Sequence, residues 1–203
     1  QNVNPMTAPE WARKYNLSAV INAGMFEPDT TATGYMKNFK QVNNPNLKPQ
    51  YKSVLAFNPK DKSVPEIQII DLGCQKFDKI SIKYNTLTQN LRMIDCNGKN
   101  TWSNSKKMWS TAAIAIDNEG KPLFIHSRSP YTVHDLIEIL LDTKHLNIKN
   151  ALYVEGGPEA SLYVRAGDRV INRIGSYETN FNENDNNIQY WPIPNVIGIK
   201  KRN

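Results

Sequence analysis

One stretch of the chain carries a clear helical repeat, and apolar segments precede and follow it. Between residues 132 and 144, apolar side chains recur at the i, i+3, i+4, i+7 and i+8 positions that form one stripe along a helix. They are Val133, Leu136, Ile137, Leu140 and Leu141. Thr132 can cap this helix, and Asp135 suits the positive end of its dipole. Because apolar segments occupy residues 122–127 and 151–154, the order strand, helix, strand predicts a right-handed crossover between parallel strands.

Short apolar segments bounded by turn residues dominate the rest of the chain. They occupy residues 18–22, 51–57, 66–71, 79–83, 91–95, 111–117, 161–165 and 194–200. Gly120 can adopt a positive φ in the turn at residues 117–120, which predicts a β-hairpin there. A shorter helix is predicted after Thr7, because Thr7 and Glu10 have the spacing of a capping box. The sequence therefore predicts an α+β fold with a mixed β-sheet and few helices.

Length and composition favour one domain over residues 1–203. Of the 203 residues, 39% are hydrophobic, so the chain can bury a sizeable core. No internal repeat or linker divides it, and residues 43–50 and 178–187 are expected to be surface loops. No segment approaches the ~20 apolar residues that cross a bilayer, so no membrane span is expected.

The charge balance of the chain is basic but does not point to nucleic acid. Lys and Arg number 25 against 19 Asp and Glu, which gives a net charge of +6. The basic residues are scattered, and no zinc-ligand spacing or RNA-binding signature accompanies them, so sequence-specific nucleic-acid binding is not expected. The alternatives are a solvated basic surface and attraction to an anionic cell envelope or a phosphorylated substrate.

Two segments place polar residues and glycines at the ends of apolar strands. Asn22 ends the strand at residues 18–22, and Gly24 follows where the chain must turn. Glu155 leaves the strand at residues 151–154, and Gly156 and Gly157 would let the backbone approach a ligand closely. Each segment also has a plain structural explanation: an Asn that satisfies a turn, and a Gly-Gly turn with exposed acids.

Further charged or titratable side chains stand near these strands. His126 could carry a proton and Arg128 could hold a phosphate or carboxylate in its fork, although a single His at a strand end often has a structural role. Arg92 interrupts an apolar strand, and the alternative to a binding role is that it pairs with a buried acid. Glu159 follows Glu155 by four residues, so the two could divide acid and base roles.

Several familiar chemistries are absent from the sequence. There is no Gly-x-Ser-x-Gly elbow, no phosphate-binding P-loop, no Gly-x-Gly-x-x-Gly and no two-His metal motif. Cys74 and Cys96 could form one bridge in an oxidising compartment, or both could be small buried residues. No cofactor is predicted, although a divalent cation could bridge a phosphate through Glu155 or Asp95.

Taken in order, these segments resemble the phosphodiester glycosidase family, which includes the enzyme that uncovers mannose 6-phosphate on lysosomal proteins and bacterial exopolysaccharide-related proteins. The segments that carry the likeness are residues 20–26, 33–35, 88–95, 111–117 and 150–157. Family members split a sugar-1-phosphodiester at the sugar side, which releases a free sugar and a phosphomonoester. The resemblance implies the same reaction here, on an anionic or phosphorylated glycan, in a protein that is secreted, periplasmic or on the cell surface.

The resemblance also implies roles for the residues named above. Glu155 would face an oxocarbenium-like centre or act as the base for water, Arg92 and Arg128 would grip the phosphate, and Asn22 would hydrogen-bond the sugar or the phosphate. The catalytic residues are thus predicted to be Glu155, Arg128 and Asn22, and the substrate-binding residues Arg92, Gly156, Gly157, Gly24, His126 and Glu159. The early strands expected before the first helix are missing, as in a processed or truncated form.

The chain departs from the family pattern at the predicted site. Glu155 stands where the family usually has Asp, and Ser110 replaces a common Arg. Arg92 lies in a segment whose sequence in family members is often Gln-Ser-Gly-Pro-Met. These departures leave two alternatives to the family reaction. One is a non-catalytic carbohydrate-binding member, and the other is a hydrolase of ordinary glycosidic bonds that uses Glu155 and Glu159.

Overall fold

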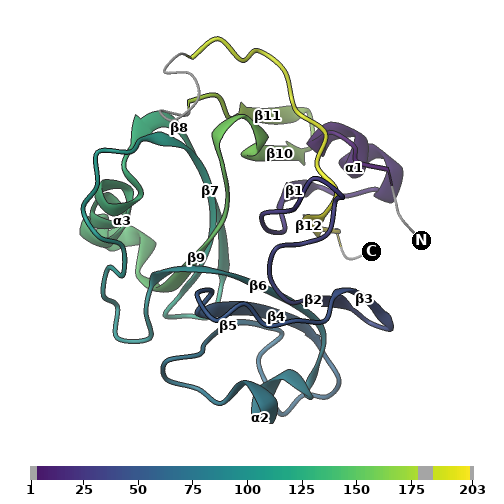
Figure 1. Cartoon of the computed structure of the whole chain (residues 1–203). Helices are drawn as coiled ribbons and strands as arrows, with labels where there is room; N and C mark the ends of the chain where they lie inside the picture. Colours follow the sequence, from purple (N-terminus) through teal and green to yellow (C-terminus); the bar gives the residue numbers. More distant parts are fainter. Residues whose placement is uncertain (1–3, 178–184, 202–203) are drawn as a thin grey trace.

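Two β-sheets face each other across the main core, and a helix covers the outer side of each (Figure 1). The computed structural model describes residues 4–177 and 185–201, apart from the side chains of residues 129 and 130. The helices are α1 (Ala8–Tyr15), α2 (Phe77–Ser81) and α3 (Val133–Asp142), with 3-10 turns η1 (Lys144–Leu146) and η2 (Gly157–Glu159). The strands are β1 (Ala19–Asn22), β2 (Met36–Asn38), β3 (Gln41–Asn44), β4 (Ser53–Pro59), β5 (Ile67–Asp71), β6 (Tyr84–Ile94), β7 (Trp109–Asp117), β8 (Pro122–Tyr131), β9 (Ile148–Gly156), β10 (Ser161–Ala166), β11 (Arg169–Ile174) and β12 (Val196–Ile199).

The strand order confirms the α+β class but corrects one detail of the predicted sheet. The smaller sheet has the order β11-β10-β1-β12, and the larger has the order β3-β2-β6-β9-β7-β8, with β4 beside β6 and β5 beside β4. Every described pair is antiparallel, so the parallel neighbours of a mixed sheet are not found. The crossover through α3 does join two strands of the same direction, β8 and β9. However, β7 lies between them and pairs with both.

Local signals explain where several elements begin and turn. Thr7 and Glu10 form the capping box at the start of α1. At α3 the Thr132 side chain accepts the Asp135 N–H at 3.0 Å, and the helix ends at Asp142, two residues earlier than expected. Gly120 has a φ of +83° in the turn between β7 and β8, as the hairpin requires.

Other elements differ from the sequence prediction. The strand expected at residues 79–83 is wrong, because this segment belongs to α2 and the turn after it. Phe77 and Ile80, three residues apart, both pack on the core beneath α2, whereas Ile82 is exposed, so the helical spacing prevails over the alternating one. The segment at residues 91–95 is the end of the longer β6, and β2, β3 and β11 were not predicted. Most of the loop expected at residues 178–187 lies outside the described residues.

The hydrophobic core is divided by the sheets into layers. The cluster between the two sheets combines side chains of the smaller sheet, such as Ile21 and Leu162, with those of the larger, such as Ile114 and Leu152. A second cluster lies between the larger sheet and α3, and a third lies between the smaller sheet and α1. Of the candidate site residues, Asn22 ends β1, Glu155 and Gly156 end β9, and His126 and Arg128 lie on β8. Among the helices that the structure describes, none is long and apolar enough to cross a membrane.

Candidate active site

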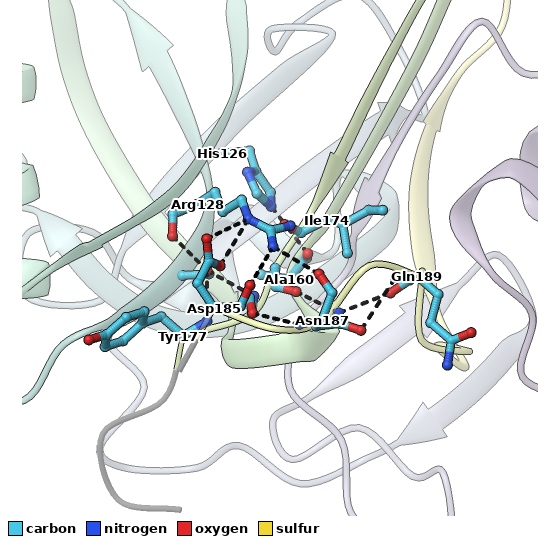
Figure 2. Close-up of polar contacts among 11 residues, drawn as sticks. His126, Arg128, Ala160, Ile174, Tyr177, Asp185, Asn187 and Gln189 are labelled. Carbon is cyan, nitrogen blue, oxygen red and sulfur yellow. Dashed lines mark hydrogen bonds and ion pairs between the residues drawn. The ribbon is translucent and has the colours of Figure 1, made fainter. Parts of the chain in front are cut away.

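The three sequence segments that carry the candidate residues meet at the turn η2 and the residues just after it. The amide oxygen of Asn22 accepts the N–H of Ser161 at 2.8 Å, and its amide nitrogen donates to the Glu159 carbonyl at 3.0 Å. From the other sheet, Nε2 of His126 lies 3.2 Å from the carbonyl oxygen of Ala160 (Figure 2). The end of β1, the end of β9 and the middle of β8 are therefore joined at one place.

A β-bulge in β9 sets the direction of Glu155. In the register with β7, Ala113 pairs with Tyr153 and Ala112 pairs with Glu155, so Val154 is the extra residue of the bulge. Ala113 and Tyr153 belong to the core beneath α3, whereas Ala112 belongs to the core between the sheets. Because directly paired residues share a face, the bulge turns Glu155 to the inner face, the side on which η2 lies.

Burial gives the Glu155 carboxyl an unusual affinity for its proton. The residue is 8% exposed, and its Oε1 accepts the N–H of Gly156 at 3.0 Å. Burial raises the pKa of Glu155 to about 8, the Gly156 hydrogen bond works in the opposite direction, and the charge of Glu159 adds to the rise. A carboxyl group with a pKa close to neutrality is suited to exchange protons with a substrate or water.

Aromatic side chains pack directly against the Gly-Gly turn. A Cβ on Gly156 would collide with the Tyr153 hydroxyl and lie 2.8 Å from Cδ1 of Trp109, so only glycine fits there. Tyr153 is buried, and the nearby charge of Glu155 adds to the effect of burial in raising the pKa of its hydroxyl. The neighbouring Trp109 side chain works against this rise in the pKa. Gly157 has a φ of +61° and starts the turn.

His126 lies in the same row of the sheet as Glu155. Its register partner on β7 is Ala112, which also pairs with Glu155, so the two side chains flank one small residue on one face. Two strand spacings separate them by about 10 Å. Burial lowers the pKa of His126 to about 4, and the charges of Arg173 and Arg128 add to this effect. The ring is therefore neutral near pH 7, and its Nδ1 is buried without a partner in the described part of the chain.

Arg128 is held by the segment that follows β11. Its Nε lies 3.0 Å from a carboxylate oxygen of Asp185, and its two terminal nitrogens donate to backbone carbonyls at 2.8 to 3.3 Å. Figure 2 shows these contacts with Ile174, Asp185 and Asn187. The guanidinium thus donates its hydrogen bonds to the protein's own backbone. That Arg128 binds a phosphate stays a prediction.

Arg92 is likewise paired within the protein. Its guanidinium lies 2.7 Å from the buried carboxylate of Asp71, which also accepts the N–H groups of Gly73 and Cys96. This is the arrangement expected if Arg92 balances a buried acid, and a role in phosphate binding remains untested. Cys96 forms a disulfide with Cys74, which resolves the alternative left open by the sequence.

Two further predicted residues have clear structural surroundings. A Cβ on Gly24 would lie 2.6 Å from the amide oxygen of Asn90, whose amide nitrogen donates to the Ala23 carbonyl at 3.0 Å. Gly24 therefore allows β6 and the loop after β1 to approach closely. Glu159 lies in η2, half-buried, and its charge raises the pKa of Glu155, so the two carboxyl groups belong to one local environment.

Comparison with known proteins shows the family to which this chain belongs. The family model for phosphodiester glycosidase matches residues 15–200. This chain belongs to the phosphodiester glycosidase family. A search of curated proteins found no match.

Two solved structures share the fold of this family member. One is the catalytic domain of zebrafish N-acetylglucosamine-1-phosphodiester alpha-N-acetylglucosaminidase, auto-inhibited by its pro-peptide. It has a TM-score of 0.67 and 14% identity, over 99% of this chain and 68% of that one. The other is a hypothetical protein from Synechocystis, with a TM-score of 0.59 and 14% identity, over 85% of this chain and 52% of that one. At this identity the likeness shows the fold alone.

A divalent cation at the site of this phosphodiester glycosidase family member stays a prediction. Within the described residues, the group of possible ligands consists of Asp71, Cys74 and Cys96, and the two sulfurs are bonded to each other. Neither Glu155 nor Asp95, the residues considered for a bridging cation, belongs to it. One carboxylate oxygen of Asp95 accepts the N–H groups of Asn97 and Lys99 in its own turn.

Sequence reasoning missed the aromatic and acidic partners of the site. By sequence pattern, Tyr153 and Trp109 are ordinary strand residues. Only the structure shows that they pack against Gly156 and leave no room for a side chain there. Asp71 and Asp185 come from β5 and from the segment after β11, far along the chain from the arginines that they bind. The one available signal was that Arg92 interrupts an apolar strand and so needs a partner, such as a buried acid.

Replacing Asn22 with alanine is expected to loosen η2. The change removes both hydrogen bonds to the Glu159–Ser161 backbone and leaves a buried N–H and a buried carbonyl without their partner, at a cost of about 2 kcal/mol. Chemical denaturation measures the loss. The matched control is Asn195→Ala, since the Asn195 side chain is half-buried and has no hydrogen bond within the described residues. Equal stability of the two variants would contradict the assignment.

Proposed function

We propose that this protein hydrolyses sugar-1-phosphodiesters between the anomeric carbon and the phosphate oxygen, which releases a free sugar and a phosphomonoester. Membership of the phosphodiester glycosidase family supports the reaction class. The observation that carries the proposal is the buried Glu155 carboxyl, turned by a bulge to the inner face beside the Gly-Gly turn. Family membership leaves the substrate open, and the structure supports the choice of Glu155.

Glu155 is proposed to act as the base for the attacking water. As the bond from the anomeric carbon to the phosphate oxygen breaks, its electron pair stays with the phosphate, and the Glu155 carboxylate takes a proton from the water that adds to the carbon. A phosphomonoester is a stable leaving group, so the reaction needs little proton donation. Because the pKa of Glu155 is about 8, the base is mostly protonated at pH 7. The value of kcat/KM should therefore rise with pH and level off above about 8.

The test is hydrolysis of a panel of sugar-1-phosphodiesters by the wild type and Glu155→Gln. Free sugar and phosphomonoester are measured separately. The panel includes an N-acetylglucosamine-1-phosphodiester, because the structurally similar zebrafish enzyme is named for it. The glutamine cannot accept the proton, so turnover should fall by at least about a hundredfold.

The control for this experiment is Glu119→Gln. Glu119 is an exposed acid in the turn between β7 and β8, where it pairs with Lys121, and its loss should leave turnover unchanged. Retained turnover in Glu155→Gln would contradict the role of Glu155. No turnover of any panel member by the wild type would contradict the reaction itself.

A non-catalytic carbohydrate-binding role is favoured by a different observation. Both arginines that were expected to grip the phosphate are engaged elsewhere, Arg92 by Asp71 and Arg128 by Asp185 and three backbone carbonyls. Wild-type protein that binds an anionic glycan but turns over no phosphodiester would support this alternative. Hydrolysis of simple glycosides that is lost in both Glu155→Gln and Glu159→Gln would instead support an ordinary glycosidase.

We further propose that the protein works outside the cytoplasm, in polysaccharide or cell-wall metabolism. The bridge between Cys74 and Cys96 supports an oxidising compartment. The net charge of +6 would draw in an anionic polymer. Labelling of free thiols in protein taken directly from its source is the test: two reactive thiols per chain would contradict this localisation.

A further inference from the structure

One edge of the smaller sheet has no partner strand among the described residues. β12 ends the strand order β11-β10-β1-β12, so β1 pairs with one of its edges and the other edge stays open. The N–H of Ala23 donates to the Asn195 carbonyl at 3.2 Å, next to the β1–β12 ladder. Hydrogen-bonded and non-bonded pairs alternate in an antiparallel ladder, so Ile197 bonds toward β1. The backbone N–H and C=O groups of Val196 and Gly198 therefore point away from β1.

These outward backbone groups have no hydrogen-bond partner within residues 4–177 and 185–201, the part of the chain that the structure describes. Val196 is half-buried and Gly198 is exposed, so a ligand can reach both. An extended peptide that joins a sheet edge bonds the unpaired N–H and C=O groups of every second residue. The open edge of β12 therefore has the backbone groups that a further strand needs.

A cavity of about 810 Å³ surrounds this edge. Its lining includes Trp11 and Leu17, which pack on the α1 side of the smaller sheet, and Met36 and Phe57, which belong to the core between the sheets. Since the smaller sheet separates these two sides, a cavity that reaches both must pass around the edge of that sheet. The strand of the smaller sheet that lines it is β12. Figure 1 shows β12 between α1 and the β2–β3 hairpin.

The lining has apolar side chains toward both faces of an added strand, and its charges balance. Its charged residues are Lys37 and Asp29, one of each sign, and its other polar side chains are uncharged amides and hydroxyls. A strand beside β12 would have α1 on one face and the larger sheet on the other, as β1 has. All four residues of β1 are buried. Because strands covered on both faces have continuous apolar sequences, the added strand is expected to be apolar throughout and uncharged.

A single extended segment fits this edge better than a second copy of the chain does. In a second copy, β12 would again lie between α1 and the β2–β3 hairpin. These flanking elements of the two copies would meet before the two edges could pair. An extended segment has no flanking layers, so it can enter between α1 and the hairpin.

We propose that β12 binds an extended, apolar and uncharged peptide segment of a partner protein as a fifth strand of the smaller sheet. The segment bonds the outward N–H and C=O groups of Val196 and Gly198, and its side chains alternate between the α1 side and the larger sheet. Four residues match the length of β12, about 13 Å. None of the predicted catalytic or substrate-binding residues lines the cavity, so this binding does not depend on the hydrolysis proposed above.

The test uses the full chain on an array of hexapeptides. One half of the array has four consecutive apolar residues between two serines, and the other half has alternating apolar and polar residues. The best binder is then labelled and titrated in solution by fluorescence anisotropy. The continuous apolar peptides should bind, and the alternating ones should bind at least about tenfold more weakly.

Two substitutions of Gly198 form a matched pair that tests the backbone bonds. Gly198→Ala and Gly198→Pro both add a Cβ, which would lie 2.5 Å from a methyl carbon of Leu17 and displace that flexible side chain. Only proline also removes the outward N–H. Because this N–H points away from β1, the β1–β12 ladder keeps its hydrogen bonds. Gly198→Pro should therefore bind the best peptide at least about tenfold more weakly than Gly198→Ala.

A second pair of variants tests the apolar lining without touching β12. Val42 on β3 lines the cavity and is 47% exposed, so Val42→Lys should fold normally and weaken the apolar peptide by about fivefold. The control is Val170→Lys on β11, the opposite edge of the smaller sheet. Val170 is 49% exposed and does not line the cavity, so this variant should bind like the wild type. Glu155→Gln should also bind like the wild type.

Modified peptides test the same bonds from the side of the ligand. An N-methyl group on a residue that faces β12 should abolish binding, whereas one on the next residue should be tolerated, because adjacent N–H groups point to opposite edges. This comparison holds even if thermal melts show that Gly198→Pro is unfolded.

Several results would overturn the proposal. An array without any binding is one, and equal effects of N-methylation at adjacent residues is another. Equal binding by folded Gly198→Pro and Gly198→Ala would also contradict it, as would a peptide that Val42→Lys and Val170→Lys weaken alike. A dimer in analytical ultracentrifugation that Gly198→Pro dissociates and that excludes the peptide would assign the edge to a second copy of the chain.

Discussion

Glu155→Gln is expected to stabilise the protein at pH 9 and to leave its stability nearly unchanged at pH 4. Burial raises the pKa of Glu155 from 4.5 to about 8 in the folded protein. Between these two values the folded state binds the proton and the unfolded state does not, so the free energy of unfolding falls as the pH rises. A pKa difference of this size corresponds to about 5 kcal/mol above pH 8, a large part of the stability of an ordinary domain.

The glutamine variant isolates this contribution. Its side chain is neutral at every pH, has nearly the same shape, and can still accept the N–H of Gly156. Denaturation of both proteins between pH 4 and 9 gives a difference curve in which the other titrating groups cancel. The difference should be small at pH 4, grow from about pH 4.5 to 8, and then level off. Glu119→Gln serves again as the exposed control and should give a flat curve.

A flat difference curve for Glu155→Gln would contradict the burial of an isolated carboxyl. It would mean that a partner in solution, such as a bound cation, keeps Glu155 ionised in the folded protein. The stability curve and the activity curve then test each other. If Glu155 is the base, the pH range over which stability falls is the range over which kcat/KM rises.

The parts of the fold that the sequence predicts well are those set by neighbouring residues. Thr7 with Glu10 and Thr132 with Asp135 cap their own helices, so a few consecutive letters are enough. Gly120 marks a hairpin for the same reason. The segment at residues 79–83 fails because five residues fit both the alternating and the helical spacing, and only the position of the core decides between them.

The candidate site is predicted in its residues but not in its geometry. Asn22, His126 and Glu155 each stand out because a polar residue ends or interrupts an apolar strand. That they meet at one turn depends on contacts across the two sheets, between residues 34 to 139 positions apart. The bulge at Val154 could not be foreseen either, since it shows only in the register with β7. Without that bulge, alternation would place Glu155 on the same face as Tyr153, toward α3.

Gly175→Ala is expected to cost about 3 kcal/mol or more, although Gly175 follows the last residue of β11 and is not itself a candidate site residue. Its N–H donates to the Ala160 carbonyl at 2.7 Å, which brings the two backbones together. A Cβ on Gly175 would overlap the carbonyl oxygen of Gly157 and lie 2.8 Å from that of Ala160. Backbone atoms cannot rotate away as a side chain can, so the turn itself must move.

The same displacement should reach the candidate active site. Gly157 and Ala160 bound the turn that Asn22 and His126 hold, so moving it disturbs Glu155 and lowers turnover along with stability. The matched control is Gly167→Ala, whose φ of +59° is strained for alanine but whose Cβ would meet open space. Its cost should be only about 1 kcal/mol, with turnover unchanged. Equal losses in the two variants would contradict close packing of β11 on η2 as the reason for glycine at residue 175.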